Sequence, residues 1–311
     1  YDVNLLNDKL KTPLHIACEY ENYEMTKFLL DLKASVNVFD KHSCTPFYIV
    51  CKTHKNESIL KLLIEHGADV NLKNEFLNTP FHEIAKVVNN VHLLKLLSSH
   101  QGKINEKNKD GETPLHLASK VEHNFHNIEQ LLSSGALVNV LNVDLNSPLH
   151  FVCKYDSNYD VVKMLIKFKS DVNCKNDVLK TPLHIAALNN VEGQIIEFLL
   201  SNQAFVDSSD SLLNTPLHYA CQKENNYEPI SVLLEHQANV NFKNEKSKTP
   251  FHYVCSYNDA VIMAMFFNFH PECKIKDEKG NWPISYCTKS YSKLVLLLDY
   301  DPSLVHYCDK K

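Results

Sequence analysis

Thr181-Pro182-Leu183-His184-Ile185-Ala186-Ala187 is one of nine related stretches in this 311-residue sequence, and together they decide the fold. Their prolines recur at intervals of 33 or 34 residues. A repeat of this length is typical of a protein built from stacked, similar units. We predict a single array over residues 1–311, with units that start near residues 12, 45, 79, 113, 147, 181, 215, 249 and 282.

Each unit predicts two short antiparallel helices. The threonine or serine before the proline is a preferred N-cap, and proline suits the first helical turn, where no N–H donor is needed. A second amphipathic run starts about ten residues later and carries paired aliphatic residues, such as Leu62-Leu63. One helix pair cannot bury these residues alone, so neighbouring units must stack. Val-Asn and a short polar stretch, as at Val70-Asn71, then predict an extended finger that ends in a turn.

The repeat resembles the ankyrin repeat in its period and its Thr-Pro-Leu-His-x-Ala signature, and the resemblance covers essentially the whole chain. It implies an all-α solenoid of helix-turn-helix pairs with β-hairpin-like fingers. Two departures stand out. The glycine that ends the second helix in the family is replaced in most units, from Lys33 to Pro271, and asparagine-containing segments such as Asn89-Asn90 join the two helices. We therefore expect strained helix ends and longer loops between helices.

Seven histidines recur in register, but they predict no metal site. Stacked repeats lie about 10 Å apart, whereas zinc needs four ligands within about 2.0–2.3 Å of one point. The resemblance implies instead that each histidine hydrogen-bonds to the backbone near its helix start. We also interpret the local pair His123 and His126 as a chance cluster, and we expect no metal and no cofactor. The seven are His15, His82, His116, His150, His184, His218 and His252.

Five of the ten cysteines share one repeat position, where other units have alanine or serine. A small buried residue is expected there. The spacing between repeats exceeds the Cα separation of about 4.4–6.8 Å that a disulfide tolerates, so we predict reduced cysteines and a cytoplasmic, reducing compartment. For a secreted effector this would be the host cytoplasm. Cys44, near a finger, is the best candidate for an exposed thiol.

Composition and motifs exclude several classes of protein. The net charge of −5, with lysine as the only basic residue besides histidine, disfavours nucleic acid as a partner. The six glycines are never closer than nine residues, so no glycine-rich phosphate loop exists. The longest apolar run, residues 260–267, is too short for a membrane span, which needs about 20 residues. His82-Glu83-Ile84-Ala85-Lys86 lacks the second histidine of a zincin helix, and we predict no catalytic residues.

Residues that vary between units at exposed positions are available to specify a partner. Helix-end residues Tyr20, Lys52, Lys120, Tyr155 and Tyr257 align with the concave surface. The tips of several fingers are apolar, and the fingers from 143 to 213 would form a contiguous apolar patch. The alternative is that each tip leucine packs onto the neighbouring finger. The predicted partner-binding residues are Phe76, Leu77, Val143, Leu145, Tyr155, Val178, Leu179, Leu212 and Leu213.

The sequence thus predicts a non-enzymatic recognition or scaffold module that binds a partner protein in a concave groove and on its finger tips. Two alternatives remain: the targeting region of a larger enzyme or effector, and the cytoplasmic repeat array of a channel or toxin. The chain starts at Tyr1 without an initiator methionine, so we expect a slice of a longer protein. The last unit is contracted, with Cys287 one position early, which predicts a terminal cap or a junction.

Overall fold

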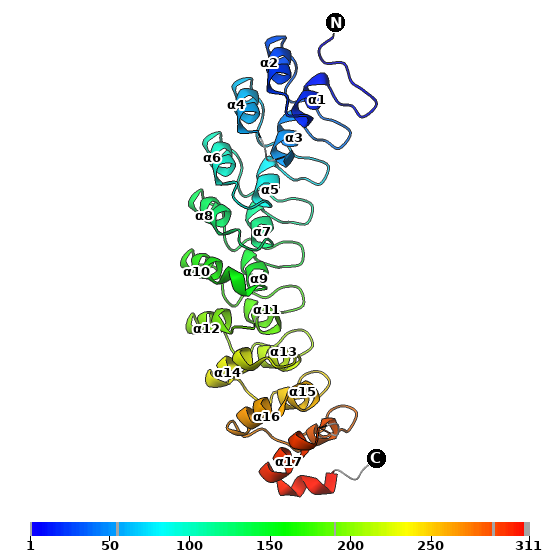
Figure 1. The fold of residues 1–311 in the computed structure, drawn as a ribbon, viewed down its shortest axis with the longest axis vertical. Coiled ribbons are helices and arrows are strands. Elements are labelled where there is room, and N and C mark those ends of the chain that lie inside the picture. The colour runs from blue at the N-terminus through cyan, green and yellow to red at the C-terminus, as the bar shows by residue number, and fades with distance from the viewer. Residues whose placement is uncertain (1, 54–55, 190, 288–289, 308–311) are drawn as a thin grey trace. The chain divides into compact units, whose positions relative to one another are not determined.

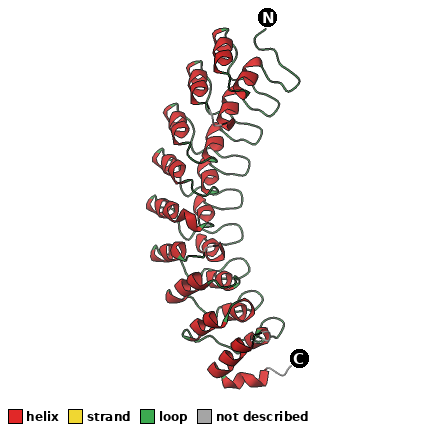
Figure 2. Ribbon diagram, viewed as in Figure 1, coloured by secondary structure: helices red, strands yellow, loops and turns green. Residues whose placement is uncertain are grey.

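The computed structural model describes residues 2–53, 56–189, 191–287 and 290–307. The chain divides into two compact units, residues 1–151 and 152–311, and each is described by itself. The described residues form helices and turns without a strand, so the fingers close as turns rather than as a β-ladder (Figure 2). The single array over residues 1–311 stays a prediction.

In the first unit, helices that start at the repeat prolines pack in the order α1, α3, α5 and α7, and the second helix of each repeat packs beside its own first helix (Figure 1). We call the proline-led helices inner and the others outer. The inner helices are α1 (Pro13–Glu19), α3 (Pro46–Thr53), α5 (Pro80–Ala85), α7 (Pro114–Ser119) and α9 (Pro148–Val152), which ends at the unit boundary. The outer helices are α2 (Tyr23–Asp31), α4 (Glu57–Glu65), α6 (Val91–Ser99) and α8 (Phe125–Ser133).

The second unit follows the same plan. Its inner helices are α11 (Pro182–Asn189), α13 (Pro216–Cys221) and α15 (Pro250–Tyr257), followed by the 3₁₀ helix η2 (Pro283–Tyr286). Its outer helices are α10 (Tyr159–Lys167), α12 (Gln194–Ser201), α14 (Tyr227–Glu235), α16 (Ala260–Phe267) and α17 (Tyr291–Tyr300). Two further 3₁₀ helices are η1 (Asp156–Asn158) and η3 (Pro302–Tyr307). The contraction of the last repeat therefore replaces its inner α-helix with a single 3₁₀ turn.

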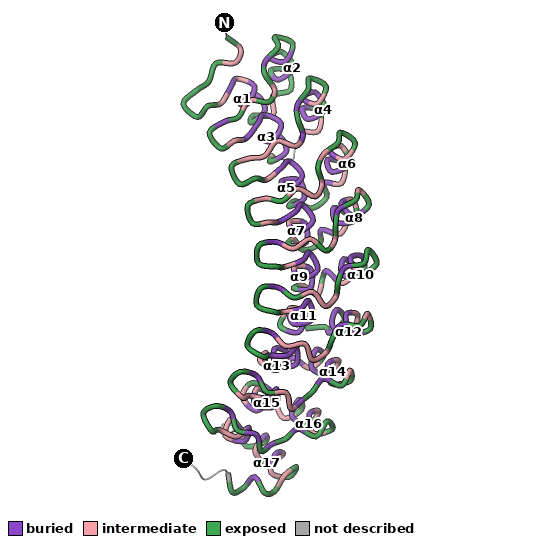
Figure 3. The backbone as a smooth tube through the Cα atoms, turned by 180° about the vertical axis from the view of Figure 1, so that it is seen from behind, coloured by how far each residue is buried: buried purple, intermediate pink, exposed green. Residues whose placement is uncertain are grey.

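The paired aliphatic residues form the core, as predicted. The side chains of four of these residues are completely buried: Leu63, Leu131, Leu199 and Leu233. The ends of the fingers, by contrast, are exposed (Figure 3). Full burial of one leucine contributes about 1.5–3 kcal/mol, which an isolated helix pair could not gain. Stacking of neighbouring repeats within each unit is thus the main source of stability.

The ends of the outer helices are strained, as predicted. Lys33, Gln101, Lys169, Gln203 and Gln237 adopt left-handed backbone angles, with φ between 58° and 69°, a conformation that costs a non-glycine residue about 1–2 kcal/mol. One position in the prediction was wrong. The left-handed residue of the repeat that contains α16 is His270 (φ 52°) and not Pro271, because the proline ring holds φ near −65°.

Asparagine side chains connect successive repeats. In the first unit, the Asn105 amide nitrogen donates to the carbonyl of Gly135 at 3.0 Å, and its oxygen accepts from the N–H of Leu137 at 2.9 Å. Asn124, in the loop between α7 and α8, donates to the carbonyl of Ala85 in the preceding repeat at 2.9 Å. The asparagines of fingers and loops therefore satisfy backbone groups that stacking would otherwise leave unpaired.

Candidate protein-binding surface

Each finger is a tight turn that one side chain closes. In the finger 74–78, the Asn74 side-chain oxygen accepts from the N–H groups of Phe76 and Asn78, both at 2.9 Å. The backbone closes the same loop, because Leu77 N–H donates to the Asn74 carbonyl at 2.9 Å. Asparagine and aspartate favour such turns since their short side chains reach backbone two residues on. Asn108, Asn142, Asp210, Asn244 and Asp277 close their fingers in the same way.

The turn forces the fourth residue of every finger into the left-handed region of backbone space. Gly111 and Gly280 hold this position in two fingers, and there the conformation is free of steric cost. Leucine holds it in five others, at a cost of about 1–2 kcal/mol each, since Cβ approaches the following carbonyl. The five left-handed leucines are Leu10, Leu77, Leu145, Leu179 and Leu213, with φ between 57° and 60°.

These five leucines, which we call the tip leucines, remain on the surface. Their side chains are 42–48% exposed, so they are not packed down completely onto a neighbouring finger. The other predicted tip residues are equally accessible: Phe76 is 56% exposed, Val143 62%, Val178 41% and Leu212 51%. The structure therefore places eight of the nine predicted binding residues at exposed finger positions.

Adjacent fingers are joined by single backbone hydrogen bonds that hold their tips in register. In the first unit, Lys109 N–H donates to the carbonyl of Phe76, and Val143 N–H to that of Asp110, both at 3.0 Å. The apolar tips of this unit are thus separated by the polar finger 108–112. In the second unit, Ser211 N–H donates to the carbonyl of Val178 at 3.0 Å, so its two apolar fingers are direct neighbours. The continuous run from 143 to 213 involves both units and stays a prediction.

Tyr155, the ninth predicted residue, lies apart from the finger tips in sequence and precedes η1. It is half-buried, and the ammonium of Lys154 stands 5.0 Å from the centroid of its ring. Sequence reasoning missed Leu10, the equivalent tip leucine of the first finger, although its position in the repeat is the same as that of Leu77.

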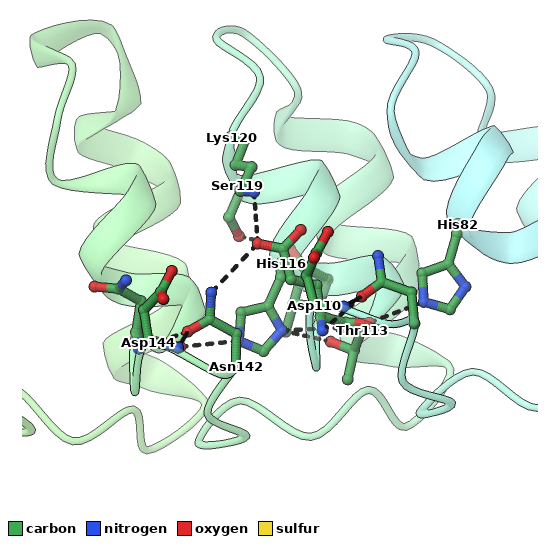
Figure 4. A network of polar contacts seen from close by, with 12 residues as sticks. His82, Asp110, Thr113, His116, Ser119, Lys120, Asn142 and Asp144 are labelled. Carbon is green, nitrogen blue, oxygen red and sulfur yellow. Dashed lines mark hydrogen bonds and ion pairs between the residues drawn. The ribbon is translucent and has the colours of Figure 1, made fainter. Parts of the chain in front are cut away.

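Buried polar groups form a network beside the inner helix α7, on the side of the inner helices that we call the inner face (Figure 4). The ammonium of Lys120 lies 2.5 Å from a carboxylate oxygen of Glu112, which is only 3% exposed. Asn142, from the next finger, donates to the same oxygen at 3.4 Å. A buried carboxylate persists as an ion only when it is paired and hydrogen-bonded. The network therefore ties the inner helix α7 to two successive fingers.

The seven histidines have the structural role that the sequence resemblance implied. In each, Nδ1 accepts from the N–H of the preceding threonine or serine at 3.0–3.1 Å. Nε2 then carries the proton, and in His82 it donates to the carbonyl of Glu112 at 3.0 Å. Burial lowers the pKa of His82 to about 4, so its ring is neutral. Among the residues that the structure describes, no group of histidine, cysteine and carboxylate side chains could hold a metal ion.

The cysteine predictions have mixed outcomes. The described cysteines form no disulfide, and the five at the shared repeat position are fully buried. The prediction of an exposed thiol at Cys44 was wrong. Cys44 lies at the base of its finger against Tyr48 and Ile49, and burial raises the pKa of its thiol to about 11. Cys174 is the more accessible cysteine, with intermediate exposure.

Comparison with known proteins agrees with this geometry. Family models described as ankyrin repeats in three copies match residues 1–74, 50–142, 81–176 and 149–244, and a model of ankyrin repeats in many copies matches residues 233–287. An ankyrin repeat protein of fowlpox virus (strain NVSL) is 41% identical over 51 residues. That alignment covers 16% of this chain and 27% of the viral protein. Because the family models together span most of the sequence, the chain belongs to the ankyrin repeat family.

Proposed function

We propose that this chain is a recognition module that binds another protein through its finger tips and inner face. Ankyrin repeats are generally protein–protein interaction modules. The tip leucines carry the proposal for this chain. Five side chains adopt a backbone conformation that costs stability, and none of them is buried in return. The turn requires this conformation in every finger, but glycine would adopt it without steric cost, as Gly111 and Gly280 do. Strain of this kind is typical of functional sites.

The composition of the tips indicates what kind of partner they bind. Exposed aliphatic and aromatic side chains gain free energy when another apolar surface covers them. The chain is acidic overall, which favours a protein over a nucleic acid. The described residues contain no helix that is long and apolar enough to cross a membrane. The contact residues of the proposal are Phe76, Leu77, Val143, Leu145, Tyr155, Val178, Leu179, Leu212 and Leu213.

We further propose that the chain has no catalytic activity and works in a reducing compartment such as the cytoplasm. The seven histidines of the repeat motif are buried and use Nδ1 to accept a backbone hydrogen bond, so they are not free to act as general bases. Reduced, buried cysteines support a reducing compartment. The same surface would serve a scaffold or the targeting part of a larger protein.

A matched pair of variants tests the proposal. The first changes Val143, Leu145, Val178 and Leu212 to aspartate. The second changes Lys41, Lys109, Lys246 and Lys279, exposed tips of the polar fingers, to serine. Both sets lower the net charge by the same amount. We expect the first variant to lose every partner that affinity capture finds with the natural protein, while both variants keep the helical circular dichroism. Equal capture by both variants would exclude the apolar tips as the binding surface.

A further inference from the structure

The first unit contains a cleft of about 700 Å³ between the fingers 40–44 and 74–78 and the inner helices α1, α3 and α5. Cys44, Tyr48 and Ile49 line it and are buried together. Phe76, which is 56% exposed, also lines the cleft, as does the aspartate that closes the first of these fingers, Asp40. The cleft therefore offers a ligand both an apolar surface and a carboxylate.

Three fingers are closed by an aspartate rather than an asparagine: those of Asp40, Asp210 and Asp277. In each of them, Oδ1 accepts from two backbone N–H groups of the turn at 2.8–2.9 Å. Closure of the turn thus uses only one of the two carboxylate oxygens. The second oxygen, Oδ2, needs a donor from elsewhere.

In two of the three fingers a tyrosine supplies this donor. The hydroxyl of Tyr219 donates to Oδ2 of Asp210 at 2.6 Å. The hydroxyl of Tyr286 donates to Oδ2 of Asp277 at 2.5 Å. Each tyrosine comes nine residues after its aspartate, in the inner helix or 3₁₀ turn that follows the finger. Both aspartates therefore have short, charge-assisted hydrogen bonds within the protein.

Asp40 lacks the corresponding tyrosine. Nine residues after it stands Ile49, whose side chain cannot donate a hydrogen bond. Among the residues that the structure describes, none donates to Oδ2 of Asp40, although this residue is only 7% exposed. The oxygen is not enclosed by protein atoms, so a ligand in the cleft can reach it. A nearly buried acceptor without a partner is costly, and a donor that satisfies it gains affinity.

The charges around the cleft favour a neutral donor over an ion. The lining holds four carboxylates, three lysines and one histidine. Three of the carboxylates have a partner, in the pairs Glu19–Lys11, Glu75–His42 and Glu83–Lys86. Asp40 and Lys52 are the other two charged residues. Because the lining is close to balanced, a hydroxyl that donates to Asp40 without bringing a charge into the cleft suits it better than a cation or an anion.

We propose that this cleft binds a tyrosine side chain of the partner protein, with its hydroxyl donating to Oδ2 of Asp40. The phenol ring lies against Ile49, which occupies the position of Tyr219 and Tyr286 in its own repeat. A tyrosine also offers a large apolar contact area at a low cost in conformational entropy. This inference rests on the proposed recognition function, and it adds the side chain that the first unit recognises.

An Ile49→Tyr variant tests the space beside Asp40, because it supplies the missing tyrosine within the chain. We expect it to fill the cleft and to unfold at a higher urea concentration than the natural protein. Ile185→Tyr is the matched control. Ile185 holds the same repeat position, but an asparagine, Asn176, closes the finger before it. A lower urea midpoint for Ile49→Tyr would show that a tyrosine does not fit beside Asp40, and it would overturn the inference.

A peptide-display selection with the whole chain tests the ligand. Random dodecapeptides are selected on the natural protein and then depleted on Ile49→Tyr, so that the remaining peptides require the open cleft. The strongest of them is synthesised with its tyrosine and with that tyrosine changed to phenylalanine. Fluorescence anisotropy gives the affinity of both peptides for the natural protein, for Asp40→Asn and for Ile185→Tyr. Asp40→Asn keeps the turn, because Asn74 closes the next finger in the same way.

We expect the remaining peptides to share a tyrosine. The phenylalanine peptide should bind the natural protein about tenfold more weakly, since it lacks only the hydroxyl. In Asp40→Asn the two peptides should differ by less than about threefold, because a neutral amide forms a weaker hydrogen bond than a carboxylate does. Ile185→Tyr should bind both peptides as the natural protein does.

Four results of the selection would overturn the inference: no peptide that requires the open cleft, peptides without a common tyrosine, equal binding of the tyrosine and phenylalanine peptides to the natural protein, or a difference between them that persists unchanged in Asp40→Asn. A loss of binding in Ile185→Tyr would also overturn it, because that residue lies outside the cleft. The finger-tip variants described above test the recognition function itself by affinity capture, so the two failures can be told apart.

Discussion

The Nε2 atom of His116 lies 3.1 Å from the carbonyl oxygen of Asn146, at the base of the next finger. On the other side of the ring, Nδ1 accepts from the N–H of Thr113 at 3.1 Å. Both hydrogen bonds require a neutral ring with its proton on Nε2, because a proton on Nδ1 would face the Thr113 donor. One histidine thus joins the start of its own helix to the following repeat.

This arrangement predicts a loss of stability in mild acid. Burial lowers the pKa of His82, His116, His184, His218 and His252 to about 4, from 6.5. The unfolded chain takes up protons below about pH 6.5, whereas the folded chain does not until about pH 4. The free energy of unfolding is therefore highest above pH 6.5. It falls as the pH drops toward 4, by about 1.4 kcal/mol per pH unit for each histidine. Urea unfolding at a series of pH values measures this slope.

A His116→Gln variant provides the control for that experiment. Glutamine cannot take up the proton, so the slope between pH 6 and 4.5 should decrease by about 1.4 kcal/mol per pH unit. The variant should also be less stable at pH 7, since glutamine does not reproduce both hydrogen bonds. An unchanged slope would show that His116 does not control acid unfolding.

Because the tip leucines are strained and exposed, we expect that replacing one of them with glycine makes the protein more stable. Leu145→Gly should raise the free energy of unfolding by about 0.5 kcal/mol, because relief of left-handed strain exceeds the added flexibility of glycine in the unfolded chain. Chemical denaturation of the natural and variant proteins measures the difference. If the tip leucines were packing residues, the same substitution would lower the free energy of unfolding by more than about 1 kcal/mol.

The hydroxyl of Tyr48 should contribute to stability through the buried Glu83 carboxylate. Tyr48→Phe removes the donor 2.6 Å from that carboxylate and should cost about 1–3 kcal/mol of unfolding free energy. Tyr20→Phe, at a tyrosine that is 79% exposed, should change it by less than about 0.5 kcal/mol. Equal effects in urea unfolding would show that the buried contact contributes nothing.

Thiol reactivity should follow burial rather than proximity to a finger. Burial raises the pKa of Cys44 to about 11, so little of its thiolate is present at pH 8. Iodoacetamide should therefore alkylate Cys174 before Cys44, as a time course with peptide mass spectrometry would reveal. Faster modification of Cys44 would mean that the base of its finger opens readily.

Most of the fold was predictable because the sequence of each repeat marks where its helices begin and which side of them is buried. Pro13 and its counterparts begin the inner helices, and pairs such as Leu62-Leu63 mark the buried side of the outer helices. The prediction was wrong at Pro271, where the contraction of the last repeats shifted the helix end to His270. A constant repeat spacing places the helix end at Pro271. The proline ring cannot adopt left-handed angles, so the helix end lies one residue earlier.

The finger tips were predictable as apolar positions but not as strained ones. That strain arises from the way Asn74 and its counterparts close the turn, which depends on hydrogen bonds rather than on composition. The contacts of the inner-helix lysines were missed for a different reason. Lys120 was assigned to the concave surface, but only the structure shows that its ammonium pairs with the buried carboxylate of Glu112.

The central claim is that the tip leucines lower the stability of the fold but bind the partner protein. The most direct test compares two double variants of the second unit, Leu179→Gly with Leu213→Gly, and Gln203→Gly with Gln237→Gly. All four residues are left-handed, so both variants should unfold at higher denaturant concentration than the natural protein. In affinity capture, the leucine variant should lose the partner and the glutamine variant should retain it. Retention of the partner by both, or a loss of stability in the leucine variant alone, would contradict the account.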